Sequence, residues 1–217
     1  MNPQNGRLFV LGGTSGIVGT LSYVLAITVS LNPTMTYVLA MGWPILSIVF
    51  VFSLFRFIEL TKASVANQFA FVFACLAFTL VAAMMSIQLG VKIGIEEYIA
   101  KSSKSQQELL ELIRRSMRLV DMGLDVAWDI FIGTSLVFLS FPLSGHDRFG
   151  RWWGVVSGIL GAALIVLNVA TFPWPPDSRD LFDIGPVIGL FIIALSIRLV
   201  VVGGRMRQPS SGAGTTA

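Results

Sequence analysis

Long apolar runs dominate the pattern of hydrophobic and polar positions along this chain. Six runs with few charged residues cover positions 8–31, 35–57, 65–90, 119–141, 152–172 and 181–202. A helix needs about 20 apolar residues to cross a hydrocarbon core of about 30 Å, and each run is long enough. The pattern therefore predicts an all-α fold, a bundle of six transmembrane helices that forms one domain over residues 1–207. The Ser-, Gly- and Thr-rich residues 208–217 are predicted to be a disordered tail.

The connection between the third and fourth runs is helical in character, unlike the shorter turns elsewhere. Glu97 with Lys101, and Glu111 with Arg115, are i,i+4 pairs in the order that supports a helix. Residues 105–108 (Ser-Gln-Gln-Glu) match a capping box, which predicts a helix start. A helix from there to the end of the fourth run is roughly 54 Å long, several turns more than the membrane needs. We therefore expect residues 92–118 to form a projecting antiparallel hairpin, turned at 101–105, with an inner seam of Ile95, Ile99, Leu109, Ile113 and Met117.

Composition agrees with a membrane-embedded chain. Of the 217 residues, 54% are hydrophobic and 12% are charged, against about 25% charged residues in soluble domains. The net charge of +3 comes from basic residues that lie between the apolar runs, where they orient helices in a bilayer instead of binding nucleic acid. The expected partner is therefore the lipid bilayer of a plasma or inner cell membrane.

The orientation in the membrane follows from the positions of lysine and arginine. With both termini inside, the inner side holds Arg7, Arg56, Lys62, Arg148, Arg151, Arg205 and Arg207. The outer side then holds Arg179 and six residues of the hairpin: Lys92, Lys101, Lys104, Arg114, Arg115 and Arg118. The counts are equal, but every inner connection is basic and the hairpin's charges belong to a folded projection, so cytoplasmic termini are predicted. Arg198 lies inside the sixth run and is expected to snorkel to the cytoplasmic headgroups.

Cysteine and histidine are too scarce for several kinds of site. The single Cys75 lies within the third run, which excludes an internal disulfide and a CxxC metal or redox motif. The single His146 lies beside Asp147 in a short basic connection, where a solvated turn is predicted. With this one histidine, placed outside the apolar runs, the bundle cannot contain a bis-histidine haem, a histidine zinc site or a Ser-His-Asp triad. No catalytic residue, metal or cofactor is assigned, and an enzyme is disfavoured, although a site made only of carboxylates stays open.

Three aspartates form the one cluster with a functional interpretation. Asp121, Asp125 and Asp129 are spaced by four residues at the start of the fourth run, so they fall within about 80° of one helix face. An acid in hydrocarbon costs a few kcal/mol unless it has a partner, so we expect this face to point into the bundle. The residues expected beside it on the outer side, from the fifth run and the start of the sixth, are Asn168, Asp180 and Asp183.

Two interpretations of this cluster stay open. As a functional site it would bind a small cation or a proton, because clustered oxygen ligands suit hard cations and crowded carboxylates favour proton uptake. As a structural feature the acids would be neutral, or hydrogen-bonded to Asn168, Thr171, Trp128 or the backbone, and would specify packing only.

Glycine and proline positions predict how the helices pack. Pairs at the small-xxx-small spacing, which lets membrane helices approach closely, are Gly12/Gly16, Gly154/Gly158, Gly185/Gly189 and Gly90/Gly94. Pro44 follows Trp43 inside the second run, so a kink is predicted there, and its freed carbonyl is either structural or lines a cavity.

Part of the chain resembles a known group of proteins. Residues 119–125 (Leu-Val-Asp-Met-Gly-Leu-Asp), the apolar span after them and residues 149–154 (Phe-Gly-Arg-Trp-Trp-Gly) are similar to a family of uncharacterised bacterial six-helix membrane proteins, classed under a domain of unknown function. In that family an acidic residue and a glycine open the fourth helix, and a short basic loop and a Gly-rich fifth helix follow. The resemblance covers mainly residues 119–171 and implies a six-helix bacterial membrane protein without implying an activity. Asp129 is not matched to the family's pattern.

Two classes of function follow from these observations. One is a cation- or proton-linked transporter or channel-like protein that uses the aspartate cluster. The other is a non-catalytic membrane subunit or sensor that docks a protein partner through the hairpin. No inverted repeat is visible, since Pro186 is only a loose counterpart of Pro44, and this weighs against a transporter.

Overall fold

The computed structural model describes residues 3–61 and 63–207, which form an all-α fold. The helices are α1 (Pro3–Thr28), α2 (Pro33–Glu59), α3 (Val65–Lys101), α4 (Lys104–Ser144), α5 (Arg151–Thr171) and α6 (Gly185–Arg207), with a short 3₁₀ helix, η1 (Pro176–Arg179), before α6. Six of them are long and apolar enough to cross a membrane, so the predicted six-span membrane protein is confirmed. The predicted tail, 208–217, lies outside the described residues.

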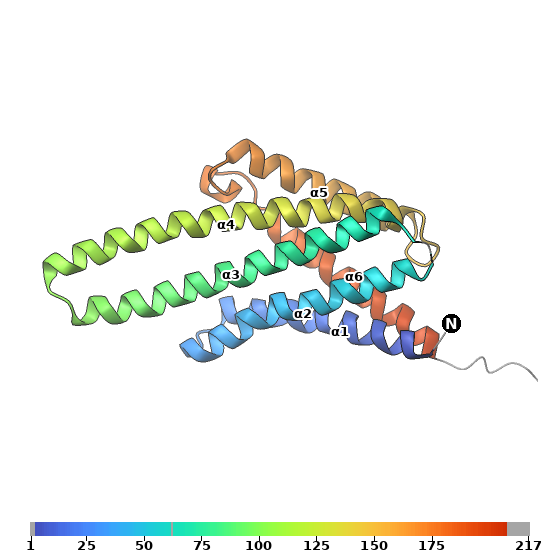
Figure 1. The fold of residues 1–217 in the computed structure, drawn as a ribbon, viewed down its shortest axis with the longest axis horizontal. Coiled ribbons are helices and arrows are strands. Elements are labelled where there is room, and N and C mark those ends of the chain that lie inside the picture. The colour runs from blue at the N-terminus through green and yellow to red at the C-terminus, as the bar shows by residue number, and fades with distance from the viewer. Residues whose placement is uncertain (1–2, 62, 208–217) are drawn as a thin grey trace, which may run out of the picture.

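The helices follow one another around the bundle. α2 packs between α1 and α3, α4 packs between α3 and α5, and α6 packs along α1. The start of α1 and the end of α6 lie at the same end of the bundle as the α2–α3 and α4–α5 connections (Figure 1). The α1–α2 turn, the α5–α6 connection and the α3–α4 hairpin lie at the opposite end. The termini of the described chain therefore share one face, as an even number of spans requires.

Glycine brings α1 close to two neighbours. A Cβ atom at Gly12 would lie 2.1 Å from the Cβ of Ser53 on α2, and one at Gly16 would lie 2.2 Å from the Oγ of Ser196 on α6. At distances this short, neighbouring atoms would have to shift to admit a side chain at either position. Gly12 and Gly16 therefore set the distance at which α1 crosses α2 and α6.

The other small-xxx-small pairs divide into two kinds. On α5, a Cβ at Gly154 would lie 2.5 Å from the carbonyl oxygen of Ser140, and one at Gly158 would lie 3.2 Å from the Cβ of Ser140. The packing interpretation does not hold for Gly90 and Gly94 on α3, where an added Cβ would meet no atom within 4 Å, nor for the pair on α6. A Cβ at Gly185 would meet only the nearby Asp183, and one at Gly189 would meet no atom within 4 Å.

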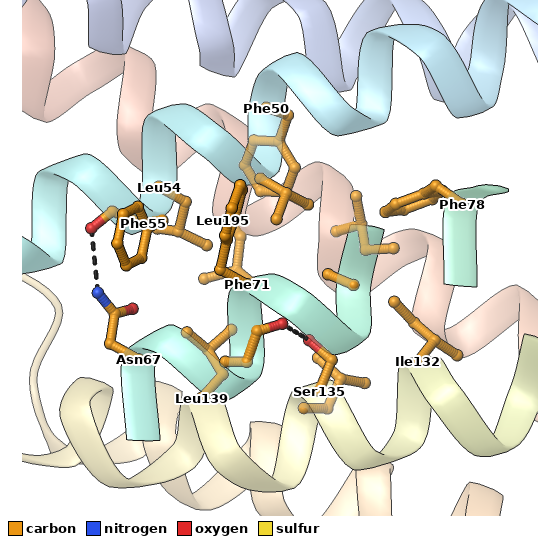
Figure 2. Close-up of a pocket in the computed structure, with 15 residues that line it drawn as sticks. Phe50, Leu54, Phe55, Asn67, Phe71, Phe78, Ile132, Ser135, Leu139 and Leu195 are labelled. Carbon is orange, nitrogen blue, oxygen red and sulfur yellow. Dashed lines mark hydrogen bonds between the residues drawn. The ribbon is translucent and has the colours of Figure 1, made fainter. Parts of the chain in front are cut away.

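Polar side chains join neighbouring helices inside the apolar core. Asn67 on α3 donates to the carbonyl of Phe55 on α2 at 3.1 Å, and Ser135 on α4 donates to the carbonyl of Ala70 on α3 at 2.7 Å (Figure 2). The pocket drawn in Figure 2 has a volume of about 40 Å³ and mostly apolar walls. A space this small, with apolar walls, is a gap within the packed core.

α3 and α4 continue well beyond the other helices as a hairpin (Figure 1). They contain 37 and 41 residues, which corresponds to about 55 and 61 Å at 1.5 Å per residue, against a hydrocarbon core of about 30 Å. The predicted projection is confirmed. The lysine of the Glu97–Lys101 pair lies 2.6 Å from its glutamate, as the i,i+4 spacing predicts.

The start of α4 and the inner seam of the hairpin differ from the prediction. The helix begins two residues earlier, because Ser103 is the N-cap residue and its N–H donates to the side chain of Gln106 at 3.0 Å. Gln107 turns inward and donates to the carbonyl oxygens of Ile99 and Ser102, at 3.1 and 3.2 Å, at the end of α3.

With Gln107 inside, the residues that share its helix face are half-buried against α3, and they include Leu110 and Met117. Leu109 and Ile113, which were predicted to line the seam, are 59% and 43% exposed. That part of the prediction is wrong, because the inward face of α4 is set by the polar cap on α3 rather than by the apolar positions alone.

His146 is not part of a solvated turn. It is only 6% exposed, its ring stacks on Phe57 at 4.9 Å between centroids, and it makes an edge contact with Phe149 at 5.5 Å. The backbone N–H of Arg148 donates to its Nδ1 at 3.2 Å. Arg198 donates to the carbonyl of Arg148 with both Nε and Nη2, so α6 is tied to the α4–α5 connection that holds the imidazole.

Candidate functional site

A cavity with a volume of about 560 Å³ lies near the end of the bundle that carries the hairpin. α1, α2, α3, α4, η1 and α6 all contribute to its walls. Most of its lining is apolar, and the acidic members are Asp125, Asp129, Asp177 and Asp183. The carboxylates from α4 thus meet those around η1 and the start of α6 in a single space.

Asp125 and Asp129 enter this cavity from α4 because one four-residue step keeps their side chains on neighbouring parts of the helix surface. Asp129 is only 4% exposed. Asn168 of α5 is fully buried, and its Nδ2 donates to Oδ2 of Asp129 at 2.8 Å and to the carbonyl of Leu164 at 3.0 Å. The predicted association of the fourth and fifth spans through Asp129 and Asn168 is therefore present in the structure.

Asp121 lies elsewhere. Its Oδ2 accepts a hydrogen bond from Nε2 of Gln88 on α3 at 2.9 Å. A separate groove between α3 and α4 is lined by Asp121 together with the basic residues Lys92, Arg114 and Arg118. The rotation of about 80° from Asp121 to Asp129 carries the stripe from the α3 side of α4 to the α5 side. The three aspartates are therefore divided between two environments.

The acids before α6 have separate positions. Asp183 lines the cavity, and its Oδ1 accepts a hydrogen bond from the N–H of Gly185 at 2.7 Å, which satisfies a free donor at the helix start. Asp180 adopts a left-handed conformation at the end of η1 and is exposed. Asp177, which the sequence did not single out, lines the cavity instead of Asp180.

Aromatic residues form a wall that the sequence analysis did not assign. Tyr23 of α1 stacks on Trp43 of α2 with ring centroids 4.2 Å apart, and Trp128 of α4 meets Trp43 edge-on at 6.0 Å. All three line the cavity. Trp43 stands beside Pro44 in the middle of a span and Trp128 immediately precedes Asp129, so both positions held a signal that sequence reasoning could have used.

Several buried polar atoms of the cavity wall lack a protein partner. Within residues 3–61 and 63–207, no hydrogen bond is made by Nε1 of Trp43, Nε1 of Trp128 or Oδ1 of Asp129. These side chains are 7%, 9% and 4% exposed. A buried polar group without a hydrogen bond costs about 1–3 kcal/mol. The site therefore combines unsatisfied indole donors with an unsatisfied carboxylate acceptor.

The lining of the cavity contains no lysine, arginine or histidine from the described part of the chain. Asp125 and Asp129 therefore share this space with no basic side chain of the described residues. The described residues also contain no group of three or more His, Cys, Asp and Glu side chains that could hold a metal ion.

Comparison of this chain with protein-family models, with curated proteins and with solved structures gives no match.

Proposed function

We propose that this integral membrane protein is a cation- or proton-linked transporter or channel-like protein whose cation site is the cavity lined by Asp125 and Asp129. The observation that carries the proposal is the pair of carboxylates Asp125 and Asp129 in a largely apolar cavity whose described lining contains no basic side chain. Charge removed from water needs a counter-charge, a proton or hydrogen bonds. A cation from solution can supply what the protein does not.

The position of the cavity supports a site loaded from one side of the membrane. Its lining includes Pro175, Pro176 and Asp177 of the α5–α6 connection, and that connection lies at the end of the bundle opposite the termini. With the termini cytoplasmic, as the distribution of basic residues predicts, the cavity faces the outside of the cell. The resemblance of residues 119–171 to six-helix bacterial membrane proteins is compatible with this placement in a plasma or inner membrane and stays a prediction.

The test compares three Asp→Asn variants on one helix. Thermal melts of the purified protein are measured at several pH values and with Na⁺, K⁺ and an organic ammonium salt. We expect cations to shift the melting temperature of the wild type and of Asp121→Asn, which lies outside the cavity, while Asp125→Asn and Asp129→Asn fold but lose the shift. The amide keeps most hydrogen bonds of the acid, so a purely structural role would leave all three variants like the wild type.

Flux measurements separate transport from binding. The protein is reconstituted in liposomes, and uptake of the cation that shifts the melt is followed under an imposed gradient. We expect uptake by the wild type and Asp121→Asn, and loss of uptake in Asp125→Asn. A protein that binds the cation without moving it contradicts transport, and equal cation responses in all variants contradict the site itself.

The second function predicted from the sequence is a membrane subunit or sensor that docks a protein partner through the hairpin. Leu109 and Leu112 on the projecting part of α4 are 59% and 60% exposed, which is compatible with that role. It stays a prediction.

A further inference from the structure

The kind of cation is indicated by the rest of the cavity wall, an inference that rests on the proposed function. An inorganic ion is held by several oxygen ligands arranged around it, and the described residues contain no group of three or more His, Cys, Asp and Glu side chains that could hold a metal ion. The cavity volume of about 560 Å³ falls within the range of about 300–1,000 Å³ typical of small-molecule sites. Its apolar walls include Ile188 and Ile192 of α6 and Met84 of α3, which suit an apolar body.

The aromatic residues add a second recognition element for positive charge. The faces of Tyr, Trp and Phe rings attract cations within about 6 Å, and quaternary ammonium groups are recognised in this way. Tyr23, Trp43 and Trp128 are brought together from α1, α2 and α4 by ring contacts of 4.2 and 6.0 Å. They line the same cavity as Asp125 and Asp129.

We propose that the cavity binds an amphipathic organic ammonium ion, with its charged nitrogen near Asp125 and Asp129 and its apolar body along α6. The rings of Tyr23, Trp43 and Trp128 line the same cavity and supply the aromatic contact for the charge. Selection for an apolar body distinguishes this ligand from Na⁺, K⁺ and protons.

Benzoylcholine is a suitable probe, because it carries a permanent positive charge and a phenyl ring. Its uncharged carbon isostere, 3,3-dimethylbutyl benzoate, has the same shape and serves as the charge control. Binding to the purified protein is measured by calorimetry and by the change in tryptophan fluorescence. We expect benzoylcholine to bind at least about tenfold more tightly than the isostere, in line with a desolvated cation–π and charge contact.

Two matched pairs of variants locate the site. Trp43→Leu removes the central ring of the aromatic wall, whereas Trp153→Leu removes an indole that contacts Phe149 and Phe191 and does not line the cavity. Gly189→Leu fills the cavity at a position where an added Cβ meets no atom within 4 Å, and Gly204→Leu is the same change at an equally open position of α6 outside the cavity. We expect about tenfold weaker benzoylcholine binding in Trp43→Leu and Gly189→Leu, and wild-type binding in both controls.

The outcomes separate this inference from the proposed function. Equal affinity for benzoylcholine and its isostere, or unchanged binding in Gly189→Leu, overturns the organic-cation inference. If Na⁺, K⁺ or protons still stabilise the protein through Asp125 and Asp129, the proposed function stands without it. If no cation distinguishes the wild type from Asp125→Asn and Asp129→Asn, both fail. Gly189→Leu keeps the test valid should Trp43→Leu not fold, because the glycine change introduces no close contact at its Cβ.

Discussion

At the residue scale, His146 links the stability of the bundle to pH. It lies in the α4–α5 connection, and burial lowers its pKa from the usual 6.5. The nearby Arg148 lowers the pKa further, whereas Asp147 opposes the shift by raising it. The unfolded chain therefore takes up a proton at a pH where the folded protein does not. The contribution of neutral His146 to the free energy of unfolding is greatest above pH 6.5. It decreases as the pH falls from there toward the folded-state pKa.

His146→Phe keeps an aromatic ring against Phe57 and removes the titration. We expect the melting temperature of the wild type to fall more than that of His146→Phe between about pH 7.5 and about pH 5.5. The difference between the two proteins is the quantity to measure, because the acids titrate in both. Parallel curves for the two proteins would show that His146 protonation has no effect on folding.

Sequence reasoning named Asn168 among the possible partners of the aspartates and missed the burial of His146, for related reasons. A carboxyl group in an apolar run is costly, so its need for a partner is visible from the sequence alone. His146 lies in a connection with Asp147 and Arg148, whose local composition indicates solvent. Its burial comes from Phe57, which is far away in the chain, and no local pattern encodes that contact.

At the scale of the helix, the approach of α1 to α2 depends on Gly12. A Cβ there would lie 2.1 Å from the Cβ of Ser53, whereas a Cβ at Gly90 on α3 would meet no atom within 4 Å. We expect Gly12→Ala to destabilise the protein by about 1–3 kcal/mol through overpacking. Gly90→Ala should be neutral or up to about 1 kcal/mol stabilising, because alanine favours the helix. Thermal or denaturant unfolding in detergent measures both, and a Gly12→Ala variant as stable as Gly90→Ala would contradict the packing.

The helices themselves were largely predictable, since apolar runs of about 20 residues admit few alternatives in a membrane. The details of the hairpin were not. A capping box was assigned at Ser105, while the structure uses Ser103 with Gln106. Both serines have a Gln or Glu three residues later, so the spacing rule fits either. The choice depends on where α3 ends and on Gln107, which reaches its last carbonyls.

At the scale of the whole molecule, the six spans place Thr34 and Ser144 at opposite ends of the bundle. In a Cys75→Ala background, Thr34→Cys and Ser144→Cys are labelled with a membrane-impermeant thiol reagent in intact cells. We expect Thr34→Cys to react from outside and Ser144→Cys only after the membrane is opened. Labelling of both from one side would contradict the six-span topology, and the reverse pattern would contradict cytoplasmic termini alone.

The cavity could be anticipated only in part. The acids were visible as an anomaly in an apolar run, and Trp43 stood beside Pro44, but nothing in the sequence showed that Tyr23, Trp43 and Trp128 would come together. Their convergence depends on how α1 and α2 cross, which glycine contacts such as Gly12 with Ser53 decide. Asp121 was grouped with the site because the helical period alone does not show which neighbour each part of α4 faces.

Because α3 and α4 are longer than the other helices, the tip of their hairpin lies far from the cavity and moves more than the helices do at the cavity. Asp125 lies 21 residues from the start of α4 at Lys104, which is about 32 Å of continuous helix. A tilt of about 10° at the level of Asp125 therefore moves the tip of the hairpin by about 5 Å. A tilt too small to alter the packing around the cavity thus produces a larger displacement at the tip of the hairpin, outside the membrane. If occupancy of the cavity tilts α4 in this way, the tip of the hairpin moves outside the bilayer.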